Sequence, residues 1–296
     1  MKRSATSLQV APPAVRLALR YDPRPESGPG EAGALYDALL AHAVQAEACG
    51  VDLVWISERP LAPGARLPAA LPLCAALAAR STRLRIGAGP LALPLYHPLR
   101  VAEDVATLDG LSGGRVELAL GLGGAAEAFA GFGVERRGRG DRLEEGIALL
   151  RAAWTGEKVV FSGRHYMVSG VGIAPRPVQQ PGPPIWVGAS AGAAIRRAAR
   201  LGAGLLAQDD AAVSVYLAAR RALGAEAPAR VAIARVAGEI LSISGRDLLA
   251  RLVETTTGAQ SVDVVIRAET GAGSEWISPG EVEDLAGVLA RFGKGS

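Results

Sequence analysis

Short apolar runs recur along the chain, and between them lie longer segments whose apolar positions are spaced by three or four residues. The short runs predict buried strands, and the longer segments predict amphipathic helices. Strands that alternate with helices favour a parallel sheet, because each parallel connection needs a crossover. The predicted strands are Val15–Tyr21, Val51–Ser57, Leu84–Pro90, Val116–Leu120, Ile185–Gly188, Gly204–Ala207, Arg230–Leu241 and Ser261–Arg267.

Helical spacing fills every interval after these strands. The predicted helices are Leu35–Cys49, Leu71–Arg80, Pro98–Leu108, Asp141–Trp154, Ala191–Leu201, Ala211–Leu223, Arg246–Thr255 and Pro279–Phe292. A (β/α)8 barrel takes about 250 residues, so a chain of 296 residues fits one barrel with short extensions. We therefore predict an α/β fold, a single TIM barrel.

The clearest strand–helix–strand unit lies between Leu84 and Gly124. Pro98 suits the first turn of its helix because proline has no N–H to leave unpaired, and Gly113–Gly114 ends the helix. Both strands are apolar, and glycines follow each of them. Glycine at the carboxyl end of a strand lets a ligand approach the backbone. The carboxyl ends of these strands are therefore the expected ligand site.

Three segments depart from the regular alternation. Between Glu157 and Pro184 the sequence predicts a small hairpin and a proline-rich connector, which we expect at the amino-terminal end of the barrel, away from the site. After the seventh strand only Ser242–Gly245 precedes the next helix, so a lid there is short or absent. Residues 1–14 are expected to form a disordered leader ahead of a barrel domain at 15–296.

Composition and charge exclude several classes of function. The net charge is only +3, and the arginines are spread over several helices without interleaved aromatic residues, so we expect no nucleic-acid partner. No apolar run is long enough to span a bilayer, so we expect no membrane partner. Cys49 and Cys74 lie among alanines in predicted helices, which favours buried thiols in a reducing, cytoplasmic compartment.

The central unit also carries a resemblance to a known family. Its sequence HPLRVAEDVATLDGLSGGRVELALGLG resembles the signature of the bacterial luciferase-like monooxygenase superfamily, and VDLVWISER and FGVERRGRGDRLEEGIALLRAAWTGE match it as well. The resemblance implies a TIM barrel that binds F420 or FMN. It also implies a small-molecule substrate and is compatible with a homodimer.

The resemblance assigns cofactor contacts to three strand ends. Ala88, Gly89 and Pro90 would form a bulge against the cofactor ring, and the Gly89–Pro90 bond could be cis because X–Pro bonds tolerate that form best. An ordinary trans strand end is the alternative. Gly121 and Gly123 would bring backbone near the cofactor, unless they only allow a tight turn. Gly188, Ala189 and Ser190 would bind its phosphate at a helix start, unless Ser190 is simply the helix N-cap.

The catalytic candidates are Glu58, Arg59 and His97. Glu58–Arg59 follows the second strand, where many relatives carry an acid and a histidine; Arg59 cannot act as an acid or base, but it can hold an anion. A surface arginine paired with Glu58 is the alternative. His97 matches the family's His-Pro position, with a structural role at the helix start as the alternative. Gly124 stands where some F420-dependent relatives carry a catalytic glutamate.

Two functional hypotheses follow. The first is a flavin- or F420-dependent oxidoreductase that acts on a small organic substrate by hydride transfer or monooxygenation. The second is a cofactor-binding or repurposed barrel without redox turnover, which the departures at Arg59 and Gly124 and the short lid favour. Four arginines that follow the fourth strand could meet an acidic cofactor tail or simply face solvent; they are Arg136, Arg137, Arg139 and Arg142.

Overall fold

A computed structural model describes residues 14–22, 32–62, 67–225, 229–235, 261–268 and 277–293. Its barrel strands are β1 (Ala14–Tyr21), β2 (Leu53–Ile56), β3 (Arg85–Ala92), β4 (Val116–Gly121), β7 (Ile185–Gly188), β8 (Gly204–Ala207), β9 (Arg230–Arg235) and β10 (Ser261–Arg267). They form a closed barrel in the order β1-β10-β9-β8-β7-β4-β3-β2. All eight pairings are parallel, so every carboxyl end lies on one rim. The predicted TIM barrel is confirmed.

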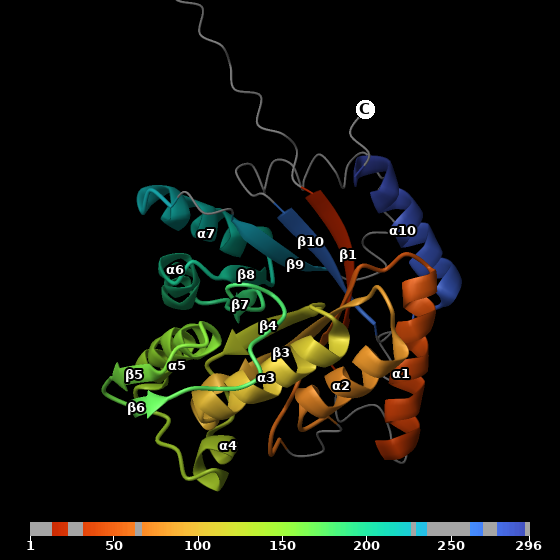
Figure 1. The fold of residues 1–296 in the computed structure, drawn as a ribbon. Coiled ribbons are helices and arrows are strands. Elements are labelled where there is room, and N and C mark those ends of the chain that lie inside the picture. The colour runs from red at the N-terminus through yellow and green to blue at the C-terminus, as the bar shows by residue number, and fades with distance from the viewer. Residues whose placement is uncertain are drawn as a thin grey trace, which may run out of the picture.

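The helices lie around the outside of the barrel (Figure 1). They are α1 (Ala32–Ala48), α2 (Ala70–Arg80), the 3-10 helix η2 (Leu93–Leu95), α3 (Pro98–Ser112), α4 (Ala126–Gly131), α5 (Arg139–Trp154), α6 (Gly192–Arg200), α7 (Asp210–Ala222) and α10 (Pro279–Gly293). The predicted helix Arg246–Thr255, the short connection before it and residues 1–13 of the leader lie outside the described residues. The short helix α4 was not predicted.

The helix boundaries in the central unit follow the expected signals. Pro98 occupies the first turn of α3, and Gly113 caps its carboxyl end in the left-handed region with φ of 65°. Glycine suits that position because it has no Cβ to clash. The sequence therefore fixes both ends of the helix that covers β3 and β4.

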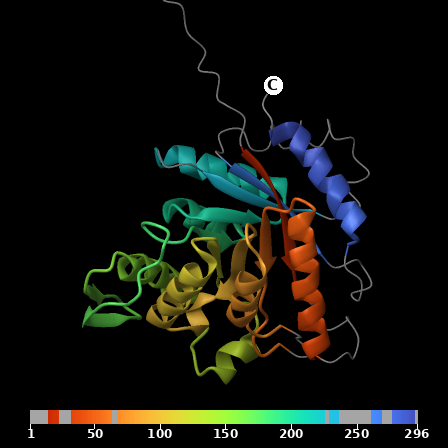
Figure 2. The same cartoon turned by 45° about the vertical axis from the view of Figure 1, so that its right-hand side comes forward.

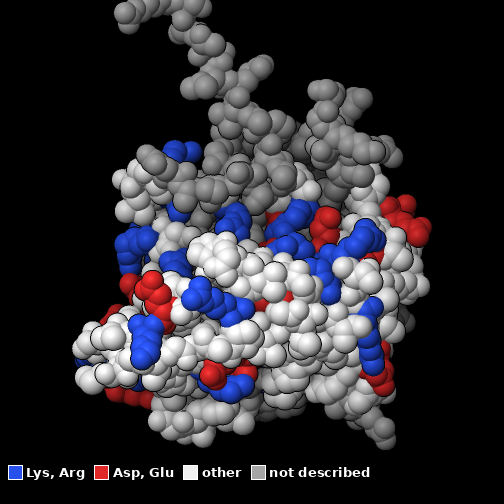
Figure 3. Space-filling view, viewed as in Figure 1, with Lys and Arg blue, Asp and Glu red and all other residues white. Residues whose placement is uncertain are grey.

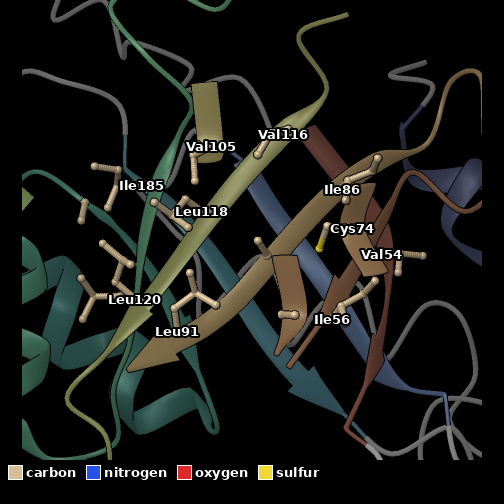
Figure 4. Close-up of a cluster of buried hydrophobic side chains, with 14 of the residues drawn as sticks. Val54, Ile56, Cys74, Ile86, Leu91, Val105, Val116, Leu118, Leu120 and Ile185 are labelled. Atoms are coloured by element: carbon tan, nitrogen blue, oxygen red, sulfur yellow. The ribbon is translucent and has the colours of Figure 1, made fainter. Parts of the chain in front are cut away.

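The hydrophobic core has an outer and an inner part. In the outer part, side chains of the barrel wall such as Ile86, Leu118 and Leu120 pack beneath the helices, together with Val105 of α3 and Cys74 of α2 (Figure 4). In the inner part, Trp55 and Trp186 meet edge to face across the barrel lumen, with 5.9 Å between ring centroids. Trp55 is fully buried and is therefore part of this inner core.

A layer of charged side chains closes the amino-terminal end of the lumen. Arg16 on β1 contacts Asp263 on β10 and Glu117 on β4, each at 2.7 Å. Arg85 also bonds to Glu117, and Nε1 of Trp186 donates to the same carboxylate at 2.8 Å. Glu117 and Asp263 are almost completely buried. Each buried carboxylate therefore has an arginine partner, which offsets the cost of removing it from water.

The last helix docks against the first. Figures 1 and 2 show α10 beside α1 and β1, and buried His42 of α1 joins these elements. Its Nδ1 lies 2.6 Å from the hydroxyl of Tyr21, and its Nε2 lies 2.9 Å from the carbonyl oxygen of Ile277. Since a carbonyl can only accept, Nε2 carries the proton and Nδ1 accepts from Tyr21.

The predicted hairpin exists as β5 (Val159–Ser162) and β6 (Met167–Val171). The connector after it lies at the amino-terminal end of the barrel as expected, where Gln179 donates to the carbonyl of Val116 at the start of β4. The expectation that the hairpin stays away from the site is wrong for its turn. Glu145 near the start of α5 accepts the backbone N–H groups of Arg164, His165 and Tyr166. These bonds draw the turn of the hairpin back along α5. The Tyr166 ring consequently lies edge to face with His97, which follows the carboxyl end of β3, at 5.7 Å.

Charged side chains on the surface pair locally. Arg197 and Arg200 of α6 both bond to Glu144 of α5, at 2.6 and 3.1 Å. On the face drawn in Figure 3, acidic and basic side chains are interspersed among uncharged ones. No helix in the described part of the chain is long and apolar enough to cross a membrane.

Candidate functional site

The carboxyl ends of β3, β4 and β7 form a surface of bare backbone around Pro90. Between Ala88 and Leu91, three steps along β3 face only two along β4, from Leu118 to Leu120, which places a bulge at Gly89–Pro90. The Gly89–Pro90 bond is cis, as expected for this position. Gly89 has φ of 108°, and a Cβ there would overlap the carbonyl oxygen of Ala119. Only glycine fits this position.

Two neighbouring strands end in glycine beside this bulge. A Cβ built on Gly121 would lie 3.6 Å from Cβ of Pro90, and one built on Gly188 would lie 3.0 Å from its Cγ. We call Gly89, Gly121 and Gly188, with Pro90 between them, the glycine shelf. It brings together residues that the sequence assigned to three separate strand ends, and it lets a flat ring approach the backbone without meeting side chains.

Gly123 and Ala88 support the shelf. Gly123 has φ of 71°, and a Cβ on it would lie 3.1 Å from both Ala92 and the ring of Phe129. Ala88 is fully buried on the outer side of β3. Ala88 would therefore contact a ligand through its backbone and not through its side chain.

The turn after β7 leads from the shelf to the start of α6. Ala189 is buried and Ser190 is exposed. The N-cap of α6 is Ala191, and no side chain caps this helix, so the alternative role of Ser190 as the N-cap is wrong. The first N–H groups of a helix carry partial positive charge and bind anions such as phosphate. Ser190 adds a hydroxyl next to them.

Glu58 lies on the outer side of the rim. Its carboxylate accepts the Tyr96 hydroxyl at 2.8 and 2.9 Å and the N–H of Ala92 at 3.2 Å. Burial raises the pKa of Glu58, and the bond from Tyr96 opposes this rise. The carboxylate opens onto a groove of about 440 Å³ between α2 and α3, lined mainly by apolar residues that include Leu71, Leu108 and Leu111.

Arg59 pairs with Asp22 rather than with Glu58. Its Nε and Nη2 donate to the two carboxylate oxygens of Asp22, both at 2.9 Å. Asp22 directly follows β1 and is buried, and Arg20 on β1 donates to Ser57 at 2.9 Å. A polar network thus covers the β1 and β2 side of the rim. Sequence reasoning missed Asp22 and Tyr96, because pairing between strand ends becomes visible only once the barrel closes.

His97 is the N-cap of α3. Its ring nitrogen Nδ1 accepts the N–H of Leu99 at 3.3 Å, and the side chain is exposed. The structure therefore gives His97 the alternative role at the helix start, and its part in chemistry stays a prediction. No cluster of three metal-ligating side chains occurs among the residues that the structure describes.

Comparisons with known proteins give independent evidence on the relatives of this chain. Residues 17–252 match the sequence model described as luciferase-like monooxygenase. The chain is 35% identical over 214 residues to the F420-dependent glucose-6-phosphate dehydrogenase of Nakamurella multipartita, covering 70% of this chain and 60% of that protein. It is 29% identical over 157 residues to the oxygenase component of the flavin-dependent trigonelline monooxygenase of Acinetobacter baylyi, covering 52% and 43%.

Solved structures extend the similarity in fold. The monooxygenase RslO1 from Streptomyces bottropensis superposes with a TM-score of 0.75 at 22% identity, covering 93% of this chain and 98% of that one. The chain spans less than two thirds of the length of the curated relatives it matches.

Proposed function

Because the chain belongs to the luciferase-like monooxygenase family, we propose that it is a flavin- or F420-dependent oxidoreductase acting on a small organic substrate. The glycine shelf carries this proposal. Three strands end in glycine around one proline, and this cradle fits the face of a flavin or deazaflavin ring. Such a ring, when bound, supplies hydride transfer or, as a reduced flavin, reaction with O2.

The residues that would hold the cofactor follow from the shelf. The backbone of Ala88, Gly89 and Pro90 would support the ring, with Gly121 and Gly123 beside it. Gly188, Ala189 and Ser190 would hold the phosphate at the uncapped start of α6. The relatives named above include one F420-dependent and one flavin-dependent enzyme, and both cofactors carry a phosphate group.

The candidate catalytic residues would act around this cradle. His97 is the exposed ring closest in sequence to the shelf, and it could transfer a proton to a bound substrate. Glu58 holds the backbone that leaves β3 through its bond to Ala92. Arg59 stays protonated, and its bond to Asp22 ties the ends of β1 and β2 together. The last two residues would therefore mainly position the rim.

The alternative is a barrel that binds the cofactor without redox turnover. The departures at Arg59 and Gly124 favour it, because neither residue can move a proton. Spectral titration of the purified chain with F420 and with FMN, followed by turnover assays with secondary alcohols, aldehydes and ketones, separates the two. Binding with turnover supports the oxidoreductase, and binding without turnover on the panel favours the alternative. Binding of neither cofactor contradicts both.

Localisation and assembly are further parts of the proposal. Cys49 and Cys74 are both free thiols, which supports a reducing, cytoplasmic compartment. The groove between α2 and α3, whose lining includes the 65% exposed Leu111, supports a homodimer through these helices. Light scattering on the purified chain measures the oligomeric state directly, and a monomer at micromolar concentration would contradict the homodimer.

A further inference from the structure

Leu61, in the loop after β2, holds a backbone conformation that leucine rarely adopts. The N–H of Ala62 donates to the carbonyl of Arg59 at 3.4 Å, which closes a turn centred on Pro60 and Leu61. Leu61 has φ of 51°. A turn with proline second and positive φ third normally carries glycine at the third position. Unfavourable backbone conformations cluster at functional sites, so a leucine in this conformation suggests that its side chain has a function.

The Leu61 side chain reaches α4. A Cβ built on Gly131 would lie 2.5 Å from Cδ1 of Leu61, so the missing side chain of Gly131 makes room for this contact. The turn follows β2 and α4 follows β4, and β3 lies between these strands. The contact therefore spans the carboxyl end of β3, the strand that carries the bulge. Figure 1 shows α4 projecting at the lower edge of the molecule.

The contact between Leu61 and α4 carries two exposed apolar side chains. Leu61 is 52% exposed and Phe132, which follows Gly131, is 51% exposed. Beneath α4, buried Phe129 lies against Gly123, two residues after Gly121 of the shelf. The helix that Leu61 contacts and that Phe132 caps therefore packs against the turn that leaves the shelf.

The two segments that meet here, the turn after β2 and the segment around α4, contain few groups that could bind an anion. Among residues 57–62 and 121–133, Arg59 is the single basic residue, and its Nε and Nη2 donate to the buried Asp22. Glu58 and Glu127 are acidic. Within these two described segments, therefore, no two cations stand together as phosphate or carboxylate groups usually require.

We propose that Leu61 and Phe132 form an apolar wall that contacts the non-reacting part of the substrate, so that the substrate carries a hydrocarbon chain or ring there. The inference rests on the proposed function, because it assumes that the substrate meets the cofactor at this rim. Leu61 is then a specificity-determining residue. Its unfavourable backbone conformation places an apolar side chain where the favoured glycine would leave a gap.

The test measures binding of 2-butanol, 2-hexanol and 2-octanol to the full chain by ligand-observed NMR, with and without cofactor. An apolar wall should raise affinity up to about fourfold for each methylene that it covers. Leu61→Asn and Phe132→Ser should each weaken 2-octanol binding several-fold and leave 2-butanol nearly unchanged. Asparagine tolerates positive φ, so Leu61→Asn keeps the turn.

Leu223→Asn is the matched control, because Leu223 is also 52% exposed but ends α7 at the opposite end of the barrel. It should leave the whole series unchanged. Equal dependence on chain length in wild type, Leu61→Asn and Phe132→Ser would overturn the proposal, as would displacement of 2-octanol by glucose 6-phosphate. If neither F420 nor FMN binds, the proposed function fails, while the alcohol series without cofactor still decides whether the wall exists.

Discussion

At the scale of single residues, the structure assigns partners that the sequence could not. Arg59 has Glu58 beside it in sequence, but its carboxylate partner is Asp22, 37 residues away. Arg16 reaches Asp263 across 247 residues and Glu117 across 101. Local periodicity carries no information about such pairs, because strand register alone brings them together. The glycines of the shelf were found from sequence, because their role depends on the local lack of a side chain.

The buried layer at the amino-terminal end of the lumen should be sensitive to single changes. Glu117→Gln removes a charge that is 2% exposed and faces both Arg16 and Arg85. Breaking a buried ion pair on one side typically costs about 3–5 kcal/mol of unfolding free energy, and we expect a loss near the lower end because Asp263 still faces Arg16. Urea denaturation measures it. Glu103→Gln, at a 45% exposed site on α3, is the matched control and should unfold like wild type.

His42 should make stability depend on pH. Burial lowers the pKa of His42 in the folded chain. Between the unfolded pKa of about 6.5 and the lower folded pKa, the unfolded chain therefore binds more protons than the folded chain. Unfolding free energy should therefore fall as pH drops from 7.5 to 5. His42→Asn should be less stable at pH 7.5 but lose less over this range. An unchanged pH slope in His42→Asn, with exposed His97→Asn as the comparison, would contradict the buried contact with Ile277.

At the scale of elements, local signals predicted most boundaries, and tertiary contacts decided the rest. The helix Pro98–Ser112 follows from its proline start and glycine end. The six-residue α4 was missed because glycines flank it and buried Phe129 anchors it only in the folded barrel. The hairpin was found, but its turn was expected away from the site, because the bonds from that turn to Glu145 are not local. These two errors concern elements that border the candidate site.

The start of α6 should contribute to cofactor affinity. Ser190→Ala removes an exposed hydroxyl beside an uncapped helix start, and one hydrogen bond to a charged phosphate is worth about 1 kcal/mol or more, roughly a fivefold change in affinity. Fluorescence titration measures the change for whichever cofactor binds. Ser214→Ala, on the outer helix α7, should have no effect. Equal affinity of Ser190→Ala and wild type would remove Ser190 from the site.

At the scale of the whole molecule, alternation of strands and helices predicted a closed barrel, and the barrel brings three glycine-ended strands to one rim. The order of strands follows from the right-handed crossovers that parallel connections require. The proposed cofactor site lies at this carboxyl rim, where the glycine shelf is. Around that rim, the side chains are polar near the ends of β1 and β2 and apolar at Leu61 and Phe132. This distribution depends on contacts between loops, which no local sequence pattern encodes.

Cofactor titration of a shelf variant tests the central claim most directly. In Gly121→Val the new Cβ makes ordinary contacts, 3.6 Å from Pro90 and 3.9 Å from the carbonyl of Leu91, so the barrel should fold while the side chain fills the shelf. Gly110→Val, on α3 where a Cβ meets no atom within 4 Å, is the control. We expect wild type and Gly110→Val to bind F420 or FMN alike, and Gly121→Val to bind at least tenfold more weakly at an unchanged melting temperature. Equal binding by Gly121→Val, or no binding of either cofactor by wild type, would contradict the account.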